Sequence, residues 1–215
     1  MTKLPLILII ATLAVLGFLF LGGNSEAMQN GADLMQDKPT EDYPTVTLAG
    51  GCFWCTESEY RALNGVLYTR VGYMGGQTDN PTYRDITTGR TGHAEVVQVT
   101  FDPEKLSYEE LLTFFLTIAH DPTQLNRQGV DVGTQYRSAI FYKDEDEKEA
   151  AQAVIEKLQP DFKKPIVTTL EPETTFWDGE DYHQQYYEKY QEETGKTHIR
   201  VIQKKARKKA KGLIQ

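Results

Sequence analysis

Cysteine is scarce in this sequence, because its 215 residues contain only two, Cys52 and Cys55. A structural zinc site takes four cysteine or histidine ligands, and this chain has no second Cys-x-x-Cys pair and only four scattered histidines. We therefore expect no metal site. A structural disulfide across so short a loop would remove little entropy from the unfolded chain, and tight loops are easily reduced. The spacing favours a redox-active pair, with a structural disulfide as the alternative.

Acidic residues are absent after Glu193, although the whole chain has a formal net charge of -8. Eight basic residues lie in this last segment. A basic segment on an acidic body can bind anionic lipid or nucleic acid, but a solvated helix end is the simpler interpretation. We expect no nucleic-acid partner and interpret residues 196–215 as a basic tail.

Long apolar runs are also few, and the one that stands out extends from Leu4 to Leu21. Lys3 precedes it, and the small residues Ser25 and Ala27 that follow form the pattern of a cleavage site. At about 1.5 Å per residue, the run is at the lower limit for crossing a bilayer. It is typical of a cleaved export signal or of a membrane anchor. Either interpretation predicts an exported protein, in the periplasm or on the extracellular face.

Four parts of the chain are therefore expected. Residues 28–44 are polar and show no periodicity, which is typical of a flexible linker. The apolar and aromatic content of the remainder is sufficient for one sizeable core. The parts are a signal peptide or anchor at 1–27, the linker at 28–44, a catalytic domain at 45–195 and the basic tail at 196–215.

Hydrophobic periodicity and capping signals predict an α+β domain. A capping box of Ser107 and Glu110 begins one helix, Asp144 caps another, and Pro160 ends the latter. A loop of about twenty residues, 75–93, is expected to be functional because of its length. The expected strands are 45–49, 66–73, 95–101, 138–142 and 166–170, and the expected helices are 56–63, those capped at 107 and 144, and 181–190. This order matches a ferredoxin-like split βαβ sandwich with an appended helix and strand.

Cys52 has the sequence context of a reactive thiol. It follows Gly50-Gly51 at the exit of a strand, at the amino end of a predicted helix, where backbone N–H groups stabilise a thiolate. Cys55 lies one turn further on the same face, so Cys52 is expected to attack and Cys55 to resolve. Phe53 and Trp54 are either core residues or an apolar cup for a methyl or thioether group.

Glu95 begins a predicted strand and shares its apolar face with Val97 and Val99. A carboxyl group in an apolar pocket has a raised pKa and can remain a neutral acid. The alternative is an exposed acid at the start of a strand. On the first interpretation, Glu95 would protonate an oxygen of the substrate.

Several motifs together resemble those of one known family. They are GGCFWCTE, GYMGG, NPTYRDI, TGHAEVVQVTFDP, HDPTQLNRQGVDVGTQYRSAIFY and DYHQQYYEKY. In this order, over roughly residues 46–190, they are similar to the peptide methionine sulfoxide reductases of the A type, which act on the S epimer of the sulfoxide. The resemblance implies an enzyme that repairs oxidised methionine in proteins and also reduces free methionine sulfoxide.

The resemblance also implies a role for each matching residue. Cys52 would attack the sulfoxide sulfur and become a sulfenic acid as methionine leaves. Glu95 would protonate or hydrogen-bond the departing oxygen. The other matches are Phe53 and Trp54 as the methyl pocket, Tyr83 and Tyr136 as the phenols that hold the oxygen, and Asp131, which would assist the later thiol steps.

Two positions depart from the family pattern. Many relatives carry recycling cysteines in a C-terminal tail, whereas this tail has none, so Cys55 is the only candidate resolving thiol. Val132 stands where relatives commonly have histidine, and a contact around the site is expected to differ.

The expected partners follow from the same resemblance. They are oxidised protein substrates and a thioredoxin-like reductant, with no metal or organic cofactor, and the protein is expected to be a monomer. Two other functions remain as alternatives: a general thiol-disulfide oxidoreductase built on Cys52 and Cys55, and a membrane-attached adaptor whose acidic body or basic tail binds a partner.

Overall fold

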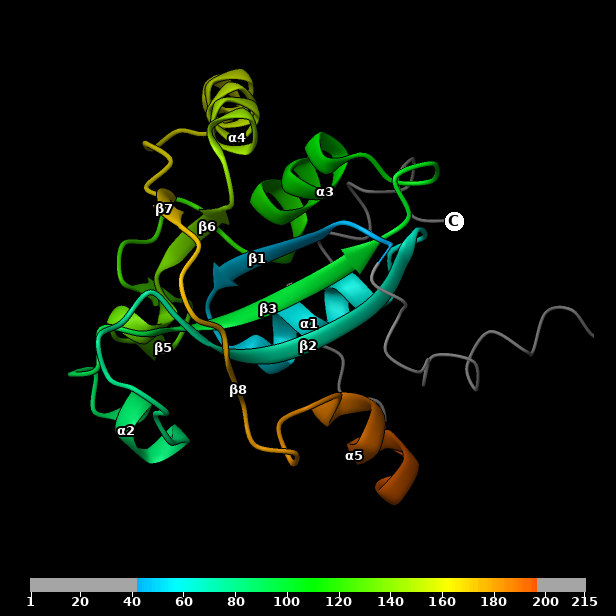
Figure 1. Ribbon diagram of the computed structural model, residues 1–215, viewed down its shortest axis with the longest axis vertical. Coiled ribbons are helices and arrows are strands. Elements are labelled where there is room, and N and C mark those ends of the chain that lie inside the picture. Colours follow the sequence, from blue (N-terminus) through cyan, green and yellow to red (C-terminus); the bar gives the residue numbers. More distant parts are fainter. Residues whose placement is uncertain (1–41, 197–215) are drawn as a thin grey trace, which may run out of the picture. The chain divides into compact units, whose positions relative to one another are not determined.

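A six-stranded sheet forms the centre of the fold in the computed structural model, which describes residues 42–196 (Figure 1). The strands lie in the order β7-β6-β1-β3-β2-β8, and neighbours are antiparallel except β6 and β7, which are parallel. Their bounds are Thr45–Gly50 (β1), Val66–Met74 (β2), Ala94–Phe101 (β3), Ser138–Tyr142 (β6), Thr169–Pro172 (β7) and Trp177–Asp178 (β8). The inner order β6-β1-β3-β2 is the predicted ferredoxin-like arrangement, which confirms the α+β fold class.

Three helices pack against one face of this sheet. They are α1 (Phe53–Arg61), α3 (Tyr108–Phe114), which continues as a π-helical turn (Phe115–Ala119), and α4 (Glu145–Leu158). One apolar cluster joins all three to the strands, and Figure 1 shows α1 behind β2 and β3. The segment between β7 and β8 lies on the opposite face, where Phe176 packs against a smaller cluster that includes Met74 and Phe141. Both faces are thus covered, and the strands at the centre are buried.

The helix starts follow the capping signals of the sequence. Ser107 accepts a hydrogen bond from the backbone of Glu110, and the Glu110 carboxylate accepts one from the backbone of Ser107 at 2.9 Å. Asp144 accepts from the backbone of Glu147 at 2.9 Å and begins α4. Both predicted caps are confirmed. Such side chains satisfy N–H groups that the first turn of a helix leaves without a partner.

Several predicted boundaries were wrong. Helix α1 begins at Phe53 rather than at residue 56, because the Cys52 carbonyl already accepts the first helical hydrogen bonds. The expected strand 166–170 is strand only from Thr169. The expected helix 181–190 is observed as α5 (Tyr186–Thr194), because Gln185 adopts a left-handed conformation, with φ of 52°, that a helix cannot include.

Other elements were not predicted at all. The expected loop 75–93 contains a short helix, α2 (Tyr83–Thr87), which begins with a capping box of Thr82 and Asp85. Strands β4 (Arg127–Gln128), β5 (Asp131–Val132) and β8 have two residues each. Two residues are too few to show alternation of apolar and polar side chains.

The predicted leader, most of the linker and most of the basic tail lie outside the described residues. Within residues 42–196, no helix combines the length and the apolar character needed to span a membrane.

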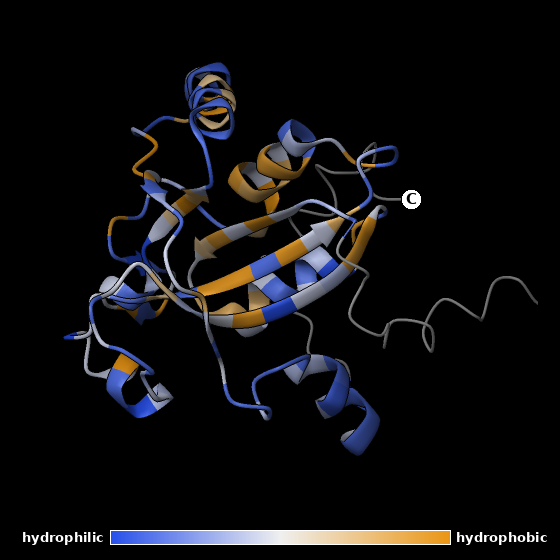
Figure 2. Ribbon diagram, in the orientation of Figure 1, coloured by the Kyte–Doolittle hydropathy of each residue, from blue (hydrophilic) through white to orange (hydrophobic). Residues whose placement is uncertain are grey.

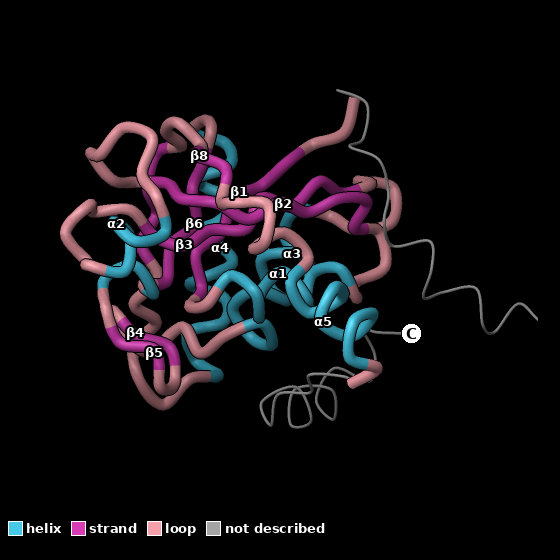
Figure 3. The backbone as a smooth tube through the Cα atoms, turned by 90° about the horizontal axis from the view of Figure 1, so that it is seen from below, coloured by secondary structure: helices cyan, strands magenta, loops and turns pink. Residues whose placement is uncertain are grey.

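Helix α5 is polar, yet it is attached to α1 (Figures 2 and 3). The Arg61 guanidinium contacts Glu188 at 3.0 Å. The Glu57 carboxylate, 1% exposed, accepts hydrogen bonds from the backbone of Gln185 at 2.8 Å and from Thr69 at 3.0 Å. Burial raises the pKa of Glu57 to about 7, and the nearby Glu188 charge acts in the same direction. The contact between these helices therefore includes an acid that titrates near neutral pH.

The free energy of unfolding is expected to depend on Glu57. Because the folded pKa exceeds the unfolded one, its stabilising contribution is complete below about pH 4.5 and is lost as pH rises through about 7. Glu57→Gln should flatten this decline, which amounts to at most ~3 kcal/mol. Urea unfolding measures the free energy of unfolding across this pH range. The matched control is Glu149→Gln, a substitution at an exposed residue of α4. Equal pH slopes for Glu57→Gln and wild type would contradict this assignment.

Candidate active site

The site is built around the amino end of α1, where Cys52 is the N-cap. Gly51 turns the chain from β1 into α1 with φ of +90°, and a side chain there would collide with Gln128, since its Cβ would lie 2.5 Å from the Gln128 Cβ. The Cys52 carbonyl accepts from the backbone of Cys55 at 3.1 Å and of Thr56 at 3.3 Å. The half-buried thiol thus lies at a helix N-terminus, which favours negative charge on sulfur.

Glu95 is the buried acid of the site. Its side chain is 2% exposed, and Oε2 accepts a hydrogen bond from the backbone N–H of Phe53 at 3.0 Å. Burial raises the pKa of Glu95 well above its usual value, and the negative charge of a Cys52 thiolate raises it further. The interpretation as an exposed acid is therefore excluded. A neutral carboxyl group beside Cys52 can donate a proton.

Two phenols complete the polar part of the site. Tyr83 begins α2, and Tyr136 ends the 3₁₀ turn Thr134–Tyr136. Burial, followed by the charge of Glu95, raises the pKa of Tyr83 to about 12 and raises that of Tyr136 as well. Both hydroxyls therefore remain protonated at neutral pH and can donate hydrogen bonds to an oxygen.

Tyr83 is held in place by a residue that the sequence did not single out. The Glu180 carboxylate accepts the backbone N–H of Tyr83 and the hydroxyl of Tyr73, both at 2.8 Å. These bonds anchor α2 and the end of β2 to the chain beyond β8, while the Thr82–Asp85 capping box fixes the start of α2 itself. The prediction that this segment is functional stays a prediction, but its residue Tyr83 lies at the site.

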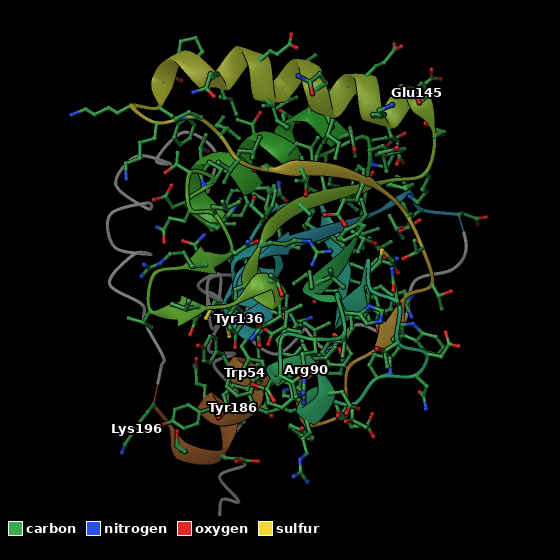
Figure 4. The ribbon with its side chains drawn as sticks, turned by 90° about the vertical axis from the view of Figure 1, so that its left-hand side faces the viewer. Trp54, Arg90, Tyr136, Glu145, Tyr186 and Lys196 are labelled. Carbon is green, nitrogen blue, oxygen red and sulfur yellow. The ribbon has the colours of Figure 1, made fainter. Side chains whose placement is uncertain are left out.

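Phe53 and Trp54 have different environments. Phe53 is 1% exposed, and its ring centroid lies 6.5 Å from that of Tyr83, nearly parallel to it. Trp54 is half-buried, stacks on Tyr186 at 3.7 Å between ring centroids, and donates its indole N–H to Nδ1 of His183 at 2.9 Å. Figure 4 shows Trp54 and Tyr186 together in the lower part of the molecule. Phe53 thus belongs to the hydrophobic core beneath the site, and of these two aromatic residues only Trp54 is partly exposed to solvent.

His183 was also missed, although it lies in the DYHQQYYEKY segment. It is fully buried and has ring contacts with Phe53 and Trp54 at 4.9 and 5.5 Å between centroids. Burial lowers the pKa of His183, so the ring is neutral, and the bond from Trp54 places its proton on Nε2. The only sequence signal was a histidine directly after a tyrosine in an aromatic-rich segment, which does not specify a partner 129 positions away.

Cys55 lies in the first turn of α1 and is 3% exposed. Its Sγ atom is 3.1 Å from the hydroxyl of Tyr187 on α5. Asp131 is half-buried on β5, where it pairs with Gln128, the residue that packs on Gly51. The charge of Asp131 contributes to the raised pKa of Glu95, Tyr83 and Tyr136, whereas the adjacent Val132 is 67% exposed.

All eight predicted site residues therefore belong to one region. Among the residues from 42 to 196, no cluster of three or more histidine, cysteine or acidic side chains could hold a metal ion. The arrangement offers a partly exposed thiol at a helix N-terminus, a buried acid, two phenolic donors, an aromatic wall and a second thiol. It can accept an oxygen atom on Cys52 and eliminate it as water with Cys55.

Comparison with known proteins gives consistent matches. The sequence profile of the family described as peptide methionine sulfoxide reductase matches residues 44–213. The protein named peptide methionine sulfoxide reductase MsrA of Methanothermobacter thermautotrophicus is 54% identical over 149 residues, which cover 68% of this chain and 88% of that protein. The protein of the same name from Deinococcus radiodurans is 49% identical over 166 residues, 76% of each chain.

Solved structures give the same result. Reduced Mxr1 of Saccharomyces cerevisiae superposes with a TM-score of 0.68 at 35% identity, over 77% of this chain and 93% of that one. Methionine sulfoxide reductase A of Corynebacterium diphtheriae has a TM-score of 0.65 at 35% identity, over 80% and 85%. Mxr1 in complex with Trx2 has a TM-score of 0.51 at 28% identity, over 71% and 91%.

Proposed function

The chain belongs to the A-type peptide methionine sulfoxide reductases, which reduce methionine-S-sulfoxide to methionine, and we propose that Cys52 is the nucleophile of this reaction. The observation that carries the assignment is the hydrogen bond from Phe53 to Glu95, which holds a buried acid beside the Cys52 helix end. The Cys52 thiolate attacks the sulfoxide sulfur. The oxygen, which receives a proton from Glu95, passes to Cys52 as a sulfenic acid, and methionine leaves.

The other predicted residues bind the substrate or the oxygen. The protonated phenols of Tyr83 and Tyr136 donate hydrogen bonds to the sulfoxide oxygen, where negative charge develops. Trp54, held by His183 and Tyr186, forms the wall against which the methyl group packs, and Phe53 supports it from the core. Asp131, close enough to influence the same groups, assists the later thiol steps.

Cys55 then resolves the sulfenic acid. Its sulfur bonds to that of Cys52, the S–O bond breaks, and the oxygen leaves as water. A thioredoxin-like dithiol reduces the resulting disulfide, a step supported by the solved complex of Mxr1 with Trx2. Oxidised proteins are the substrates, so the enzyme repairs oxidative damage.

Residues 45–195 form the catalytic domain of this proposal, since the proposed site residues lie between Cys52 and Tyr136 and the residues that orient them extend to Tyr186. The family profile extends further, to residue 213, and so includes much of the basic tail. We place the domain outside the cytoplasm because of the apolar run from Leu4 to Leu21.

Cys55→Ser should separate the two thiol steps. With Cys52 intact, one methionine per protein is expected, followed by no turnover with a dithiol reductant. Cys52→Ser should form no methionine at all. Quantifying methionine in single- and multiple-turnover assays distinguishes these outcomes. Sustained turnover by Cys52→Ser would refute the mechanism.

Glu95→Gln should slow methionine formation in a single turnover by roughly 10²- to 10⁴-fold, the usual contribution of a general acid. Glutamine can still accept the Phe53 N–H, so the geometry of α1 is kept. The wild-type rate should also fall as pH rises through the raised pKa of Glu95, and the variant should lack this decline. Exposed Glu104→Gln is the matched control. A wild-type rate for Glu95→Gln would exclude the acid role.

Export predicts that the protein is recovered outside the cytoplasm, in the released or the membrane fraction. Mass measurement of the mature N-terminus with cell fractionation tests this: a new terminus near Ala27 indicates cleavage, and an intact Met1 in the membrane fraction indicates anchoring. Recovery of the full-length chain in the cytoplasm would contradict the proposal.

A further inference from the structure

The start of α5 makes a series of contacts with α1. Four consecutive residues, Gln185 to Glu188, each contact a different residue of α1. Gln185 donates its backbone N–H to Glu57, Tyr186 stacks on Trp54, Tyr187 contacts Cys55, and Glu188 pairs with Arg61. The Tyr187 hydroxyl is thus placed at the second thiol by contacts on both sides of it.

The contact between Tyr187 and Cys55 is short and protected. The phenolic oxygen lies 3.1 Å from Sγ, within hydrogen-bond distance for sulfur, and Cys55 is 3% exposed. Little water can therefore reach this sulfur, and a negative charge on it requires a donor from the protein. The mechanism described above uses no property of Tyr187.

Formation of the Cys52–Cys55 disulfide needs a negative charge on the Cys55 sulfur. The thiolate, not the thiol, attacks sulfur. While Cys55 is a thiol, either group can donate in the hydrogen bond with Tyr187, but a thiolate can only accept. A hydrogen bond to an ionised acceptor is stronger than a neutral one, so this bond strengthens as Cys55 loses its proton.

We propose that Tyr187 is a further functional residue, whose hydroxyl donates a hydrogen bond to the Cys55 thiolate and promotes its attack on the Cys52 sulfenic acid. This inference rests on the proposed role of Cys55 as the resolving thiol. In that step the bond between the two sulfurs forms and the S–O bond of Cys52 breaks. The hydroxyl leaves with one proton as water, while Cys55 is oxidised and the Cys52 sulfur reduced.

Tyr187→Phe tests this, because it keeps the ring and removes only the hydroxyl. Rapid-quench experiments on the full chain with one equivalent of a methionine sulfoxide peptide would follow methionine and the Cys52–Cys55 disulfide separately. Methionine should form at the wild-type rate. Disulfide formation should slow by roughly ten- to a hundredfold, the range for a hydrogen bond to a charged group.

The matched control is Tyr190→Phe, which removes a phenolic hydroxyl one turn further along α5. It should form the disulfide at the wild-type rate, and thermal unfolding should confirm that both variants are folded. If Tyr190→Phe slows the step as much as Tyr187→Phe, the effect arises from the helix as a whole and the inference is wrong.

The pH profile separates a chemical role from a structural one. In wild type the rate of disulfide formation should rise with pH as Cys55 ionises, and in Tyr187→Phe this rise should move to higher pH. Uniform slowing at every pH, or an unchanged rate, would overturn the inference. If wild type forms methionine but no Cys52–Cys55 disulfide, the proposed resolving role fails as well, and the two failures are thereby distinguished.

Discussion

The hydrogen bond between the Phe53 N–H and the Glu95 carboxyl group is the contact on which the site depends. It joins the first turn of α1 to strand β3 and uses a helical N–H that has no partner within the helix. The same bond holds the acid beside Cys52, in a place that is 2% exposed. The surroundings that bury Glu95 also raise its pKa, so position and protonation have one cause.

The segment after β8 is the second constraint, because it closes the site from the far end of the chain. Glu180 holds Tyr83, His183 holds Trp54, and Tyr187 lies on Cys55. These contacts span between 97 and 132 positions in sequence. Since α5 has no buried residues, polar contacts and one aromatic stack keep it in place. The geometry around both thiols thus depends on a segment that contributes little to the core.

Local signals in the sequence predicted the parts of the fold that depend on neighbouring residues. Each of three such signals depends on residues only a few positions apart, and the structure contains all of them: the Ser107 capping box, the Asp144 cap, and the apolar face shared by Glu95 and Val97. The predicted start of the last helix was wrong because Gln185 has a left-handed backbone conformation, so that α5 begins only at Tyr186.

The partners of the site could not be predicted in the same way. Glu180 and His183 act through hydrogen bonds to distant residues, and no periodicity indicates such a bond. Strands β4 and β5 are stabilised by pairing with each other, although each is too short to have a pattern of its own. The resemblance to a family indicated which residues we propose to react, whereas the three-dimensional contacts show which residues orient them.

The central claim is that Glu95 is a neutral acid beside Cys52 at neutral pH. Infrared difference spectroscopy of wild type against Glu95→Gln measures this directly, because protonated and ionised carboxyl groups absorb at different frequencies. We predict that the difference spectrum at neutral pH contains the band of a protonated carboxylic acid. A band of an ionised carboxylate in its place would contradict the account.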